Sequence, residues 1–495
     1  MVAIYHEIVS NSKDKNLRSI QLACSDLKIV MKFGGTSVAS PDKVKHVANL
    51  VKSYSKDNSV VVVASAVRGM TDELLQISES VRKGNRAEIE KFIDKVAKMH
   101  MDIAKDAIEK KRISDELRST LSALIKELED VLSGMVLLGE VTPKSQDYLL
   151  SFGERLATPI ICFALKEIGV KAEFLTGKDA GIVTDSNYGE AKPLMDTTKL
   201  KVAHNLEPLL KDGTVPVVTG FVAADQNGNI TTLGRGGSDY TATIIASCIN
   251  ADEVWLWTDV DGLMTADPRM VKNANVLKEV SYAEAMEMAL FGAKYMHPRA
   301  LEPIVDGGIP IRIRNTFKPE NSGTLVVKSP KTNSHNIVKA VSVIRNTALI
   351  DVRGGSMVGA PGTAAKIFNV LGENKVNIMM ISQSPSESSI SMVVRKNDLD
   401  KAVNSLELNL LGKVIKTVNV TDNVAIIAVV GSGMRGIKGV ASKIFGAVAK
   451  HGINVIMIAQ GSSELNLAFV VNDKDCEEAV RAIHEEFELS KLVQA

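Results

Sequence analysis

An internal repeat near the C-terminus constrains the fold of this chain more than any other feature of its sequence. Residues 348–394 align with residues 425–471 without a gap, at a constant offset of 77 positions. Each copy has the pattern strand, glycine turn, helix, strand, turn, strand, helix, which predicts two small α+β domains of the ferredoxin-like kind. The matched pairs include Gly354/Gly431, Met357/Met434, Gly359/Gly436, Gly362/Gly439, Lys366/Lys443, Asn377/Asn454, Gln383/Gln460 and Glu387/Glu464.

The second copy also contains a glycine pattern that is typical of dinucleotide-binding proteins. Residues 431–436 have the sequence GSGMRG, which fits G-x-G-x-x-G and follows a strand-like run. The first copy does not keep this pattern. The next strand ends at Gln460, where a nicotinamide site needs an acidic residue for the ribose. We therefore expect a turn of the repeated domain here and no nicotinamide site.

Length and charge limit the classes of protein to consider. The chain has 495 residues, more than the roughly 250 to 300 at which a single core stops growing, so two or three domains are expected. With 59 basic and 58 acidic residues the formal net charge is +1, so no global field favours nucleic acid or anionic lipid. Its partners have to be recognised by local sites.

Cysteine usage and hydropathy favour a cytoplasmic protein. The cysteines lie far apart and form no C-x-x-C pair, so we expect reduced thiols and no metal site. Apolar runs such as residues 60–64 are far shorter than the roughly 20 residues that span a bilayer. Residues 1–27 form a polar extension without the apolar core of a secretory signal. The four cysteines are Cys24, Cys162, Cys248 and Cys476.

Residues 28–327 alternate short β-branched runs with longer helical periods, which predicts a mostly parallel sheet between layers of helices. Apolar residues from Leu117 to Met135 recur every three or four positions, so they predict an amphipathic helix within a helical insertion at about 71–150. The expected strands are residues 29–32, 60–64, 172–175, 214–218, 253–257 and 311–314. The expected domains are 28–327, a linker at 328–340, and the two repeats at 341–415 and 416–495.

Two glycine turns in the α/β region could bind an anion. The first expected strand runs into KFGGTS at residues 32–37, where glycine N–H groups and Lys32 could approach phosphate, although a plain tight turn is the alternative. GRGGSD at residues 234–239 surrounds an arginine with glycines before an apolar helix at 241–249, which favours anion binding over a solvated hairpin tip. Ser238 or Asp239 is expected to cap that helix. No P-loop pattern occurs in the chain.

Three further positions are candidates for the same chemistry. Asp259 follows a buried strand, at the edge of the sheet where ligands collect, but Asp-Gly and Asp-Pro pairs nearby also favour simple turns. Lys294 follows a glycine and could neutralise phosphate, whereas His297 before a proline is expected to be a structural residue. Glu154 is expected in the first turn of a helix that starts near Ser151, where the helix dipole stabilises a carboxylate.

Six motifs together resemble those of the aspartokinases in the amino-acid kinase family. KFGGTSV, SAVRGMTDEL, SFGERLA, TLGRGGSDYTA, WTDVDGLMTADPR and FGAKYMHP occur in that order, and the repeats resemble the paired ACT domains of that family. The resemblance implies an ATP- and Mg²⁺-dependent transfer of the γ-phosphoryl group to the β-carboxylate of L-aspartate. The product is 4-phospho-L-aspartate, and the reaction is the first step of lysine, threonine and methionine biosynthesis.

The resemblance also implies the roles of individual residues. Lys32 bridges the attacking carboxylate and the phosphoryl group, and Asp239 orients Lys32. The implied substrate-binding residues are Thr71, Glu154 for the α-ammonium, Arg235 for a carboxylate, and Ser238. The implied ATP-binding residues are Lys32, Gly34, Gly35, Ser65, Gly236, Gly237, Thr258, Asp259, Arg269, Lys294 and Tyr295. Met264 stands where many members have a tyrosine after the WTDV turn, and because of this departure it is not among the implied ATP-binding residues.

For the repeats the resemblance implies inhibition by an end-product amino acid. The run at residues 382–387 resembles threonine-sensitive members, so threonine is favoured over lysine, and the alternative is that these turns only pack the sheet. We expect a monofunctional enzyme that forms a homodimer or a dimer of dimers through its ACT domains. The implied effector-binding residues are Met357, Gly359, Ala360, Pro361, Asn377, Ile378, Gln383 and Ser384.

Two other functions remain open at this point. Another carboxylate kinase of the same fold, such as an acetylglutamate kinase, lacks the repeat and the long helical insertion. A catalytically silent amino-acid sensor would keep the ACT pair. Lys32, Glu154, Arg235 and Asp239 argue against a sensor, because a sensor has no need of a phosphoryl-transfer site.

Overall fold

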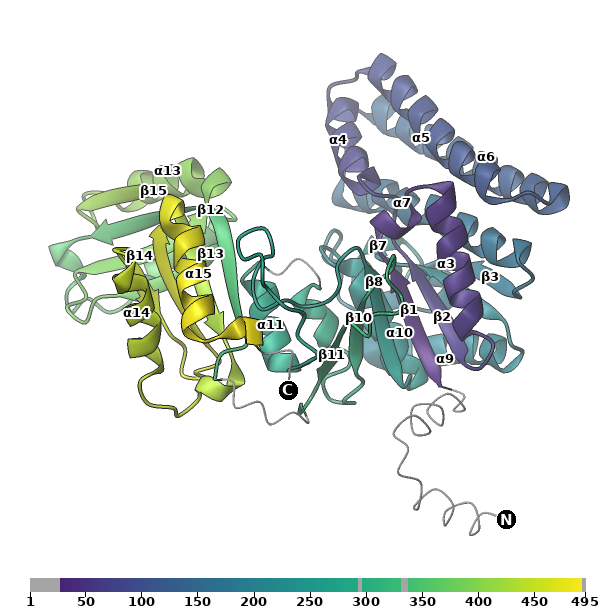
Figure 1. Ribbon diagram of the computed structural model, residues 1–495. Helices are drawn as coiled ribbons and strands as arrows, with labels where there is room; N and C mark the ends of the chain where they lie inside the picture. The colour runs from purple at the N-terminus through teal and green to yellow at the C-terminus, as the bar shows by residue number, and fades with distance from the viewer. Residues whose placement is uncertain (1–26, 293–295, 331–336, 492–495) are drawn as a thin grey trace, which may run out of the picture. The chain divides into compact units, whose positions relative to one another are not determined.

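A computed structural model describes residues 27–292, 296–330 and 337–491 of the chain. The chain forms two compact units, each with its own core (Figure 1). The first unit comprises Met1–Asp261 with Arg299–Val327, and the second comprises Gly262–Pro298 with Lys328–Ala495. The expected domain boundaries placed residues 262–298 in the first domain, whereas the structure groups Gly262–Pro298 with the second unit.

The first unit is built on a mostly parallel sheet, in agreement with the expected fold class. Neighbouring strands follow the order β3-β5-β2-β1-β8-β10-β11, and only β11 is antiparallel to its neighbour. All six expected strands are present. Their bounds are β1 Lys28–Phe33, β2 Ser59–Ala64, β3 Ala172–Leu175, β5 Val215–Thr219, β8 Glu253–Thr258, β10 Ile311–Asn315 and, in addition, β11 Thr324–Val327.

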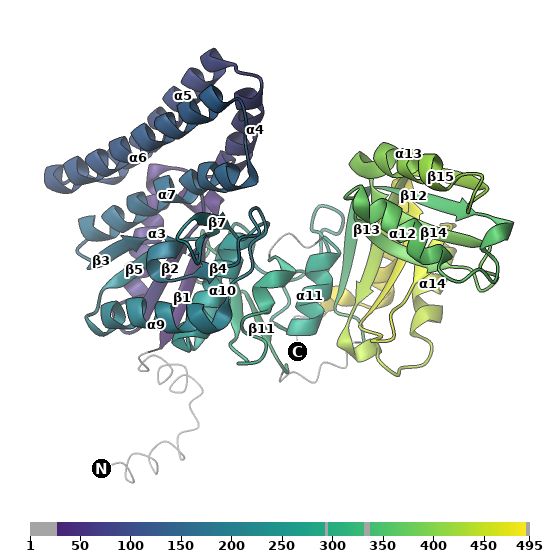
Figure 2. The ribbon, with the colours of Figure 1, turned by 180° about the vertical axis from the view of Figure 1, so that it is seen from behind.

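Helices cover both faces of this sheet. Helices α3 (Pro41–Tyr54) and α7 (Pro143–Glu167) lie on one face, and α9 (Met195–Lys211) and α10 (Gly237–Ile249) lie on the other (Figures 1 and 2). Because both faces are covered, the central strands are almost entirely apolar, as in the VVVVA run of β2. Ser40 caps α3, since its side chain accepts a hydrogen bond from the N–H of Lys43.

The expected helical insertion consists of α4 (Met70–Arg82), α5 (Arg86–Ala107) and α6 (Lys111–Leu138). Leu117, Leu121, Leu128 and Leu132 are fully buried along one side of α6, which confirms the predicted amphipathic helix. The apolar residues lie every three to four positions because this spacing keeps them on one face of a 3.6-residue period.

Helix α7 begins earlier than the sequence suggested. Thr142 caps it by accepting a hydrogen bond from the N–H of Ser145, and Pro143 occupies its first turn. Glu154 therefore lies near the middle of the helix, and the expectation that it sits in the first turn was wrong. Helix α7 is long and apolar enough to cross a membrane by composition, but 89% of its apolar window is buried within the protein, as in the core helix of a folded domain.

The three cysteines in the described part of the chain are buried and unpaired. Burial raises the pKa of the Cys162, Cys248 and Cys476 thiols to about 12. These thiols are therefore protonated near neutral pH, as expected of structural cysteines. Cys24 lies outside the described residues.

The second unit contains one antiparallel sheet with the strand order β13-β14-β12-β15-β17-β16. Its two cores confirm the two repeated α+β domains. The strands are β12 Ala340–Arg353, β13 Ile378–Gln383, β14 Ser389–Arg395, β15 Thr417–Val430, β16 Met457–Ala459 and β17 Asn466–Asn472. The helices are α12 Thr363–Glu373, α13 Leu399–Leu410, α14 Val440–Lys450 and α15 Cys476–Glu486.

Strands β12 and β15 are shared between the two repeats. Val341 in the first half of β12 packs in the core of the second repeat, whereas Ile350 in its second half packs in the core of the first. Asn346 and Asn423, which are equivalent in the repeat, interrupt the two strands with positive φ angles of 58° and 53°. The boundary expected at 415/416 therefore does not separate the two cores, because each core takes half of both strands.

Residues 262–292 and 296–298 belong to the second unit, and several of them contact the second repeat. The N–H of Val341 donates to the carbonyl of Thr265 at 2.8 Å, and the Thr265 hydroxyl lies 3.0 Å from Nε2 of the buried His484. Helix α11 (Tyr282–Leu290) is tied to the same repeat by Glu284. These contacts explain why this segment groups with the second unit and not with the sheet of the first.

Candidate active site

A cavity of about 520 Å³ opens in the first unit beside the carboxyl ends of β1 and β2. Its walls come from the turn after β1, the start of α4, the middle of α7 and the turn between β7 (Ile230–Thr232) and α10. It brings together most of the residues implied for aspartate and phosphate binding. These are Lys32, Gly35, Ser65, Thr71, Glu154, Arg235, Gly236, Gly237, Ser238 and Asp239.

Lys32 and Asp239 form the central ion pair of this cavity. The Lys32 Nζ lies 2.6 Å from Oδ1 of Asp239, and both side chains are mostly buried, with exposures of 15% and 12%. Lys32 is in β1 and Asp239 is in the first turn of α10, so two distant segments place the pair. The carboxylate therefore holds an ammonium group at the cavity wall, in the pairing that the resemblance implied.

The glycines of both predicted turns are required by geometry. A Cβ atom on Gly35 would lie 2.5 Å from the carbonyl oxygen of Ala66, so no larger residue fits there. Gly236 has a φ of +72° and is the N-cap of α10. Ser238 and Asp239 thus lie inside the first turn of this helix, and the expectation that one of them caps it was wrong. The positive φ at Gly236 starts the helix earlier.

Glu154 projects from α7 into the cavity as a buried carboxylate. It is 3% exposed, and its Oε2 atom has no hydrogen-bond partner among the described residues. Burial raises the pKa of Glu154 to about 8, and hydrogen bonds from the backbone together with the charge of Lys32 only partly oppose this shift. A buried carboxylate with an open oxygen favours a cationic ligand group.

Arg235 is exposed at the mouth of the same cavity. The turn that carries it is supported from outside, because Arg299 donates from Nη1 to the carbonyl of Leu233 at 3.1 Å. The Arg299 guanidinium also lies 4.8 Å from the ring centre of Tyr240. An exposed guanidinium on a supported turn is suited to bidentate binding of a ligand carboxylate.

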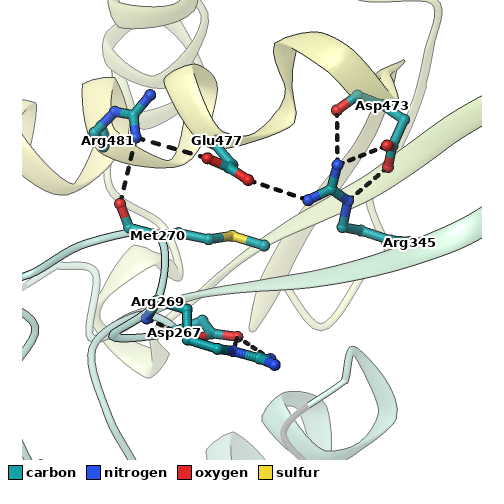
Figure 3. A network of polar contacts seen from close by, with 7 residues as sticks. All are labelled: Asp267, Arg269, Met270, Arg345, Asp473, Glu477 and Arg481. Carbon is teal, nitrogen blue, oxygen red and sulfur yellow. Dashed lines mark hydrogen bonds and ion pairs between the residues drawn. The ribbon is translucent and has the colours of Figure 1, made fainter.

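The other residues implied for ATP binding do not all lie in the first unit, and two of them lie outside the described residues. Gly34 donates its N–H to the carbonyl of Trp257 at 3.2 Å, next to Thr258 and the exposed Asp259 at the carboxyl end of β8. Arg269 belongs to the second unit, where it pairs with Asp267 at 2.6 Å (Figure 3). Lys294 and Tyr295 lie outside the described residues.

The cavity includes residues that the sequence analysis did not select. Phe221 lines it with a φ of +65°, which is unusual for a bulky residue, and its N–H donates to Thr241 Oγ1 at 3.0 Å. Arg68 stands within the SAVRGMTDEL motif, so the motif itself could have drawn attention to it. Thr232 is the first residue of the TLGRGGSDYTA motif, which could likewise have drawn attention to it, whereas Gly189 comes from a segment without any motif, and no sequence signal pointed to it.

The residues implied for effector binding lie around the glycine turn and edge strand of the first repeat. Met357 is 2% exposed and packs in the core of that repeat, whereas Pro361, Asn377 and Gln383 are exposed. The Ser384 hydroxyl lies 2.6 Å from that of Ser386. Binding of an amino acid by these residues stays a prediction.

In the described part of the chain, no group of three or more His, Cys, Asp or Glu side chains is arranged to hold a metal ion. ATP can carry Mg²⁺ through its phosphate oxygens, with water completing the coordination, so a dedicated protein cage is not required. The cations and N–H groups of the cavity fit the phosphate end of such a complex.

Both the α/β region and the two repeats match known protein families. Residues 28–315 match the family model of the amino acid kinase family, and residues 350–410 and 427–487 match that of an ACT domain. Aspartokinase 1, chloroplastic, of Arabidopsis thaliana is 32% identical over 480 residues, which cover 94% of this chain and 81% of that protein. A bifunctional aspartokinase/homoserine dehydrogenase 2 of Zea mays is 34% identical over 95% of this chain, but the chain spans only 52% of it.

Solved structures with the same fold include complexes with ligands. The crystal structure of E. coli aspartokinase III in complex with aspartate and ADP (R-state) has a TM-score of 0.77 and 30% identity. The match covers 92% of this chain and 99% of that one. The structure of the same protein with lysine and aspartate (T-state) has a TM-score of 0.78 and 30% identity, covering 94% of this chain and 100% of that one.

Proposed function

Because this chain belongs to the aspartokinases of the amino acid kinase family, we propose that it phosphorylates L-aspartate. The reaction would transfer the γ-phosphoryl group of ATP to the β-carboxylate, giving 4-phospho-L-aspartate and ADP. The observation that carries the proposal is the Lys32–Asp239 ion pair in one cavity with Glu154 and Arg235. An oriented cation, an open carboxylate and an exposed guanidinium match the groups of aspartate and a phosphoryl donor.

Phosphoryl transfer needs positioning and charge stabilisation more than covalent help from the protein. An oxygen of the β-carboxylate would attack the γ-phosphorus while the bond to the leaving ADP oxygen breaks. Lys32 would lie between these two negatively charged groups and reduce their repulsion, and Asp239 would keep the ammonium in place. The N–H groups of Gly35 and Gly236 would donate to phosphate oxygens, whereas the N–H of Gly237 donates to the carbonyl of Gly234 at 3.0 Å and holds the turn.

Glu154 and Arg235 would select the amino-acid substrate. Glu154 would accept the α-ammonium of aspartate, which supplies the missing partner of Oε2, and Arg235 would bind the α-carboxylate in a bidentate pair. Thr71 and Ser238 would contact the side-chain end of the substrate. Because the carboxylate of Glu154 is buried, an N-acylated substrate without a positive charge would leave it unpaired, at a large cost in binding.

We also propose the finer properties that the family suggests. Mg²⁺ bound by ATP would neutralise charge on the phosphates during transfer. An end-product amino acid, threonine in preference to lysine, would inhibit the enzyme by binding to the first repeat. The chain would form a homodimer or a dimer of dimers through its ACT domains and act in the cytoplasm.

The catalytic proposal is tested by measuring ADP formation with Mg²⁺ and each of L-aspartate, L-glutamate and N-acetyl-L-glutamate. We expect turnover with aspartate only. Lys32→Ala should reduce kcat by on the order of 10³-fold, since it removes the charge closest to the transferred group. Turnover with N-acetyl-L-glutamate alone would indicate another carboxylate kinase, and no turnover with any acceptor would favour an amino-acid sensor.

The effector proposal is tested by adding threonine or lysine to the aspartate reaction. Gln383→Ala should keep kcat but weaken inhibition by about tenfold, because the amide would bind the effector. Gln460→Ala changes the equivalent residue of the second repeat and serves as the matched control, with inhibition unchanged. Equal loss of inhibition in both variants would contradict a site in the first repeat.

A further inference from the structure

We infer that Asp147 is a positioning residue for aspartate binding. Asp147 is not among the residues that line the cavity, but it contacts two residues that do, and the proposed function gives it no role. The inference rests on that proposed function, because the arginine that Asp147 supports is the one expected to bind the substrate carboxylate. It goes further by identifying which buried group holds the substrate-binding turn in place.

The carboxylate of Asp147 is saturated by donors from two separate segments. It is 1% exposed on α7. Its Oδ2 atom accepts hydrogen bonds from the N–H of Thr232 at 2.8 Å and the N–H of Gly189 at 3.0 Å. Its Oδ1 atom accepts a hydrogen bond from the Thr232 hydroxyl at 2.8 Å. Three donors on one carboxylate hold both segments against the helix.

Both segments reach the cavity. Gly189 and Thr232 line it, and Thr232 is the last residue of β7, three positions before Arg235. Asp147 and Glu154 are seven residues apart on α7, so they lie on the same face, two turns from each other. The same helix thus presents Glu154 to the cavity directly and supports the Arg235 turn through Asp147.

The two segments also contact each other, so a shift of one moves the other. The N–H of Ala191 donates to the carbonyl of Thr232 at 3.0 Å. A Cβ atom on Gly234, which has a φ of +75°, would lie 3.2 Å from the carbonyl oxygen of Gly189. Without an acceptor at position 147, the buried N–H of Thr232 and the N–H of Gly189 would lose their partner and this close packing would loosen.

The experiment separates hydrogen bonding from charge and from general folding. Asp147→Leu removes the acceptors at similar size, whereas Asp147→Asn keeps an amide oxygen for the two N–H groups and an amide that can donate to the Thr232 hydroxyl. Thr232→Val removes only the hydroxyl bond. Thr198→Val is the matched control, since Thr198 is also fully buried but bonds to the backbone of Val183 beside α9.

We expect the KM for aspartate to rise by about tenfold in Asp147→Leu, which loses three hydrogen bonds, and by about threefold in Thr232→Val, which loses one. Asp147→Asn and Thr198→Val should stay within about twofold of the wild type. The KM for ATP should rise less than the KM for aspartate in every variant, because only the first residues of the turn contact Asp147. Hydrogen exchange of residues 186–191 and 230–235 should accelerate in Asp147→Leu without any substrate present.

Several results would overturn the inference. Wild-type KM for aspartate in both Asp147→Leu and Thr232→Val would do so, as would equal rises in the KM for aspartate and for ATP. A loss in Asp147→Asn as large as in Asp147→Leu would mean that charge, and not hydrogen bonding, matters. If the wild type does not phosphorylate aspartate, the proposed function fails, while hydrogen exchange still reports whether Asp147 holds the two segments.

Discussion

Glu154 in the first unit and Glu284 in the second are both buried glutamates, but their carboxylates have opposite surroundings. Glu154 is 3% exposed, and its Oε2 atom lacks a hydrogen-bond partner in the described part of the chain. Glu284 is fully buried, and its Oε2 atom lies 2.8 Å from the Lys339 Nζ. Burial raises the pKa of Glu154, whereas Lys339 and nearby donors outweigh burial and lower the pKa of Glu284.

The donors around Glu284 come from three segments of the second unit. The N–H and hydroxyl of Ser281 donate to Oε2 at 2.8 and 3.0 Å, which forms a capping box at the start of α11. The N–H and hydroxyl of Ser432 donate to Oε1 at 2.9 and 2.7 Å. Glu284 therefore joins α11 to the glycine turn of the second repeat.

The difference teaches how to distinguish a structural from a functional buried carboxylate. A carboxylate whose oxygens are all bonded within its own unit stabilises the fold as it stands. A carboxylate that keeps an open oxygen beside a cavity costs stability until a ligand supplies the partner. The first description fits Glu284 and the second fits Glu154.

The largest expected effect is the loss of activity in Glu154→Gln. An amide cannot neutralise the α-ammonium, so kcat/KM for aspartate should fall by roughly 10³-fold. The free energy of unfolding at pH 8 should not fall, because the variant removes the charge of a buried carboxylate whose Oε2 atom has no hydrogen-bond partner among the described residues. Kinetics and thermal denaturation of the same preparation test both parts, and a clear loss of stability would contradict the comparison.

Glu284→Gln should have the reverse outcome. It leaves the Lys339 ammonium buried without a counter-charge, so the second unit should lose about 3 kcal/mol of stability. The double variant with Lys339→Met should recover part of this loss, since it removes the unpaired charge. Calorimetry of the full chain measures the change, and an unchanged melting profile would show that the ion pair contributes nothing.

The two glutamates should also respond to pH with opposite signs. The pKa of Glu154 rises from 4.5 to about 8 in the folded state, so the folded protein binds an extra proton and its contribution to stability falls as pH rises through this range. The lowered pKa of Glu284 adds stability above its ordinary pKa, and this stability is lost as pH falls through the folded value. Denaturation at a series of pH values in the two Gln variants and the wild type separates the slopes.

The same shift predicts how substrate affinity depends on pH. Aspartate needs the ionised form of Glu154, so the KM for aspartate should fall as pH increases from 7 to 8.5, by about threefold to tenfold. Glu154→Gln should lose this dependence, and the KM for ATP should be unaffected. A KM for aspartate that is constant across this range in the wild type would mean that Glu154 is already ionised at pH 7.

The smallest expected effect compares the two repeats at one position. Ser432 in the second repeat is equivalent to Gly355 in the first. Ser432→Gly should remove the hydroxyl bond to Glu284 and cost about 1 kcal/mol. Gly355→Ser, the matched control, should change stability by less than about 0.5 kcal/mol because that turn is exposed. Equal effects in the two variants would contradict the distinct role of the second turn.

The sequence predicted a large part of the fold and of the cavity. Short β-branched runs located all six central strands, because helices cover both faces of the sheet. Apolar periodicity located helix α6, because burial of one face imposes the same period on sequence and structure. The constant offset of the repeat predicted two matching domains, and their turns keep matching positive φ angles, such as 83° at Gly362 and 86° at Gly439. Lys32 and Arg235 were selected from glycine turns whose geometry excludes larger residues.

The contacts of the remaining residues could not be predicted in this way. Asp147 and Glu284 look like ordinary helix residues, and nothing local distinguishes them from exposed carboxylates. Their partners Thr232 and Ser432 are 85 and 148 positions away. The start of α7 at Pro143 was not predicted either. The SFGERLA motif suggested a start near Ser151, although Thr142 and Pro143 offer a cap and a first-turn proline further upstream.

The sequence by itself determined the alternation of strands and helices, the duplicated domain and the glycine turns, since these depend on interactions between residues close along the chain. Tertiary structure alone decided which carboxylates are saturated and which stay open, and where the halves of β12 and β15 belong. The physical reason is that burial and hydrogen bonding depend on groups brought together from distant segments. The pKa of a glutamate is therefore a property of the folded chain and not of its sequence neighbours.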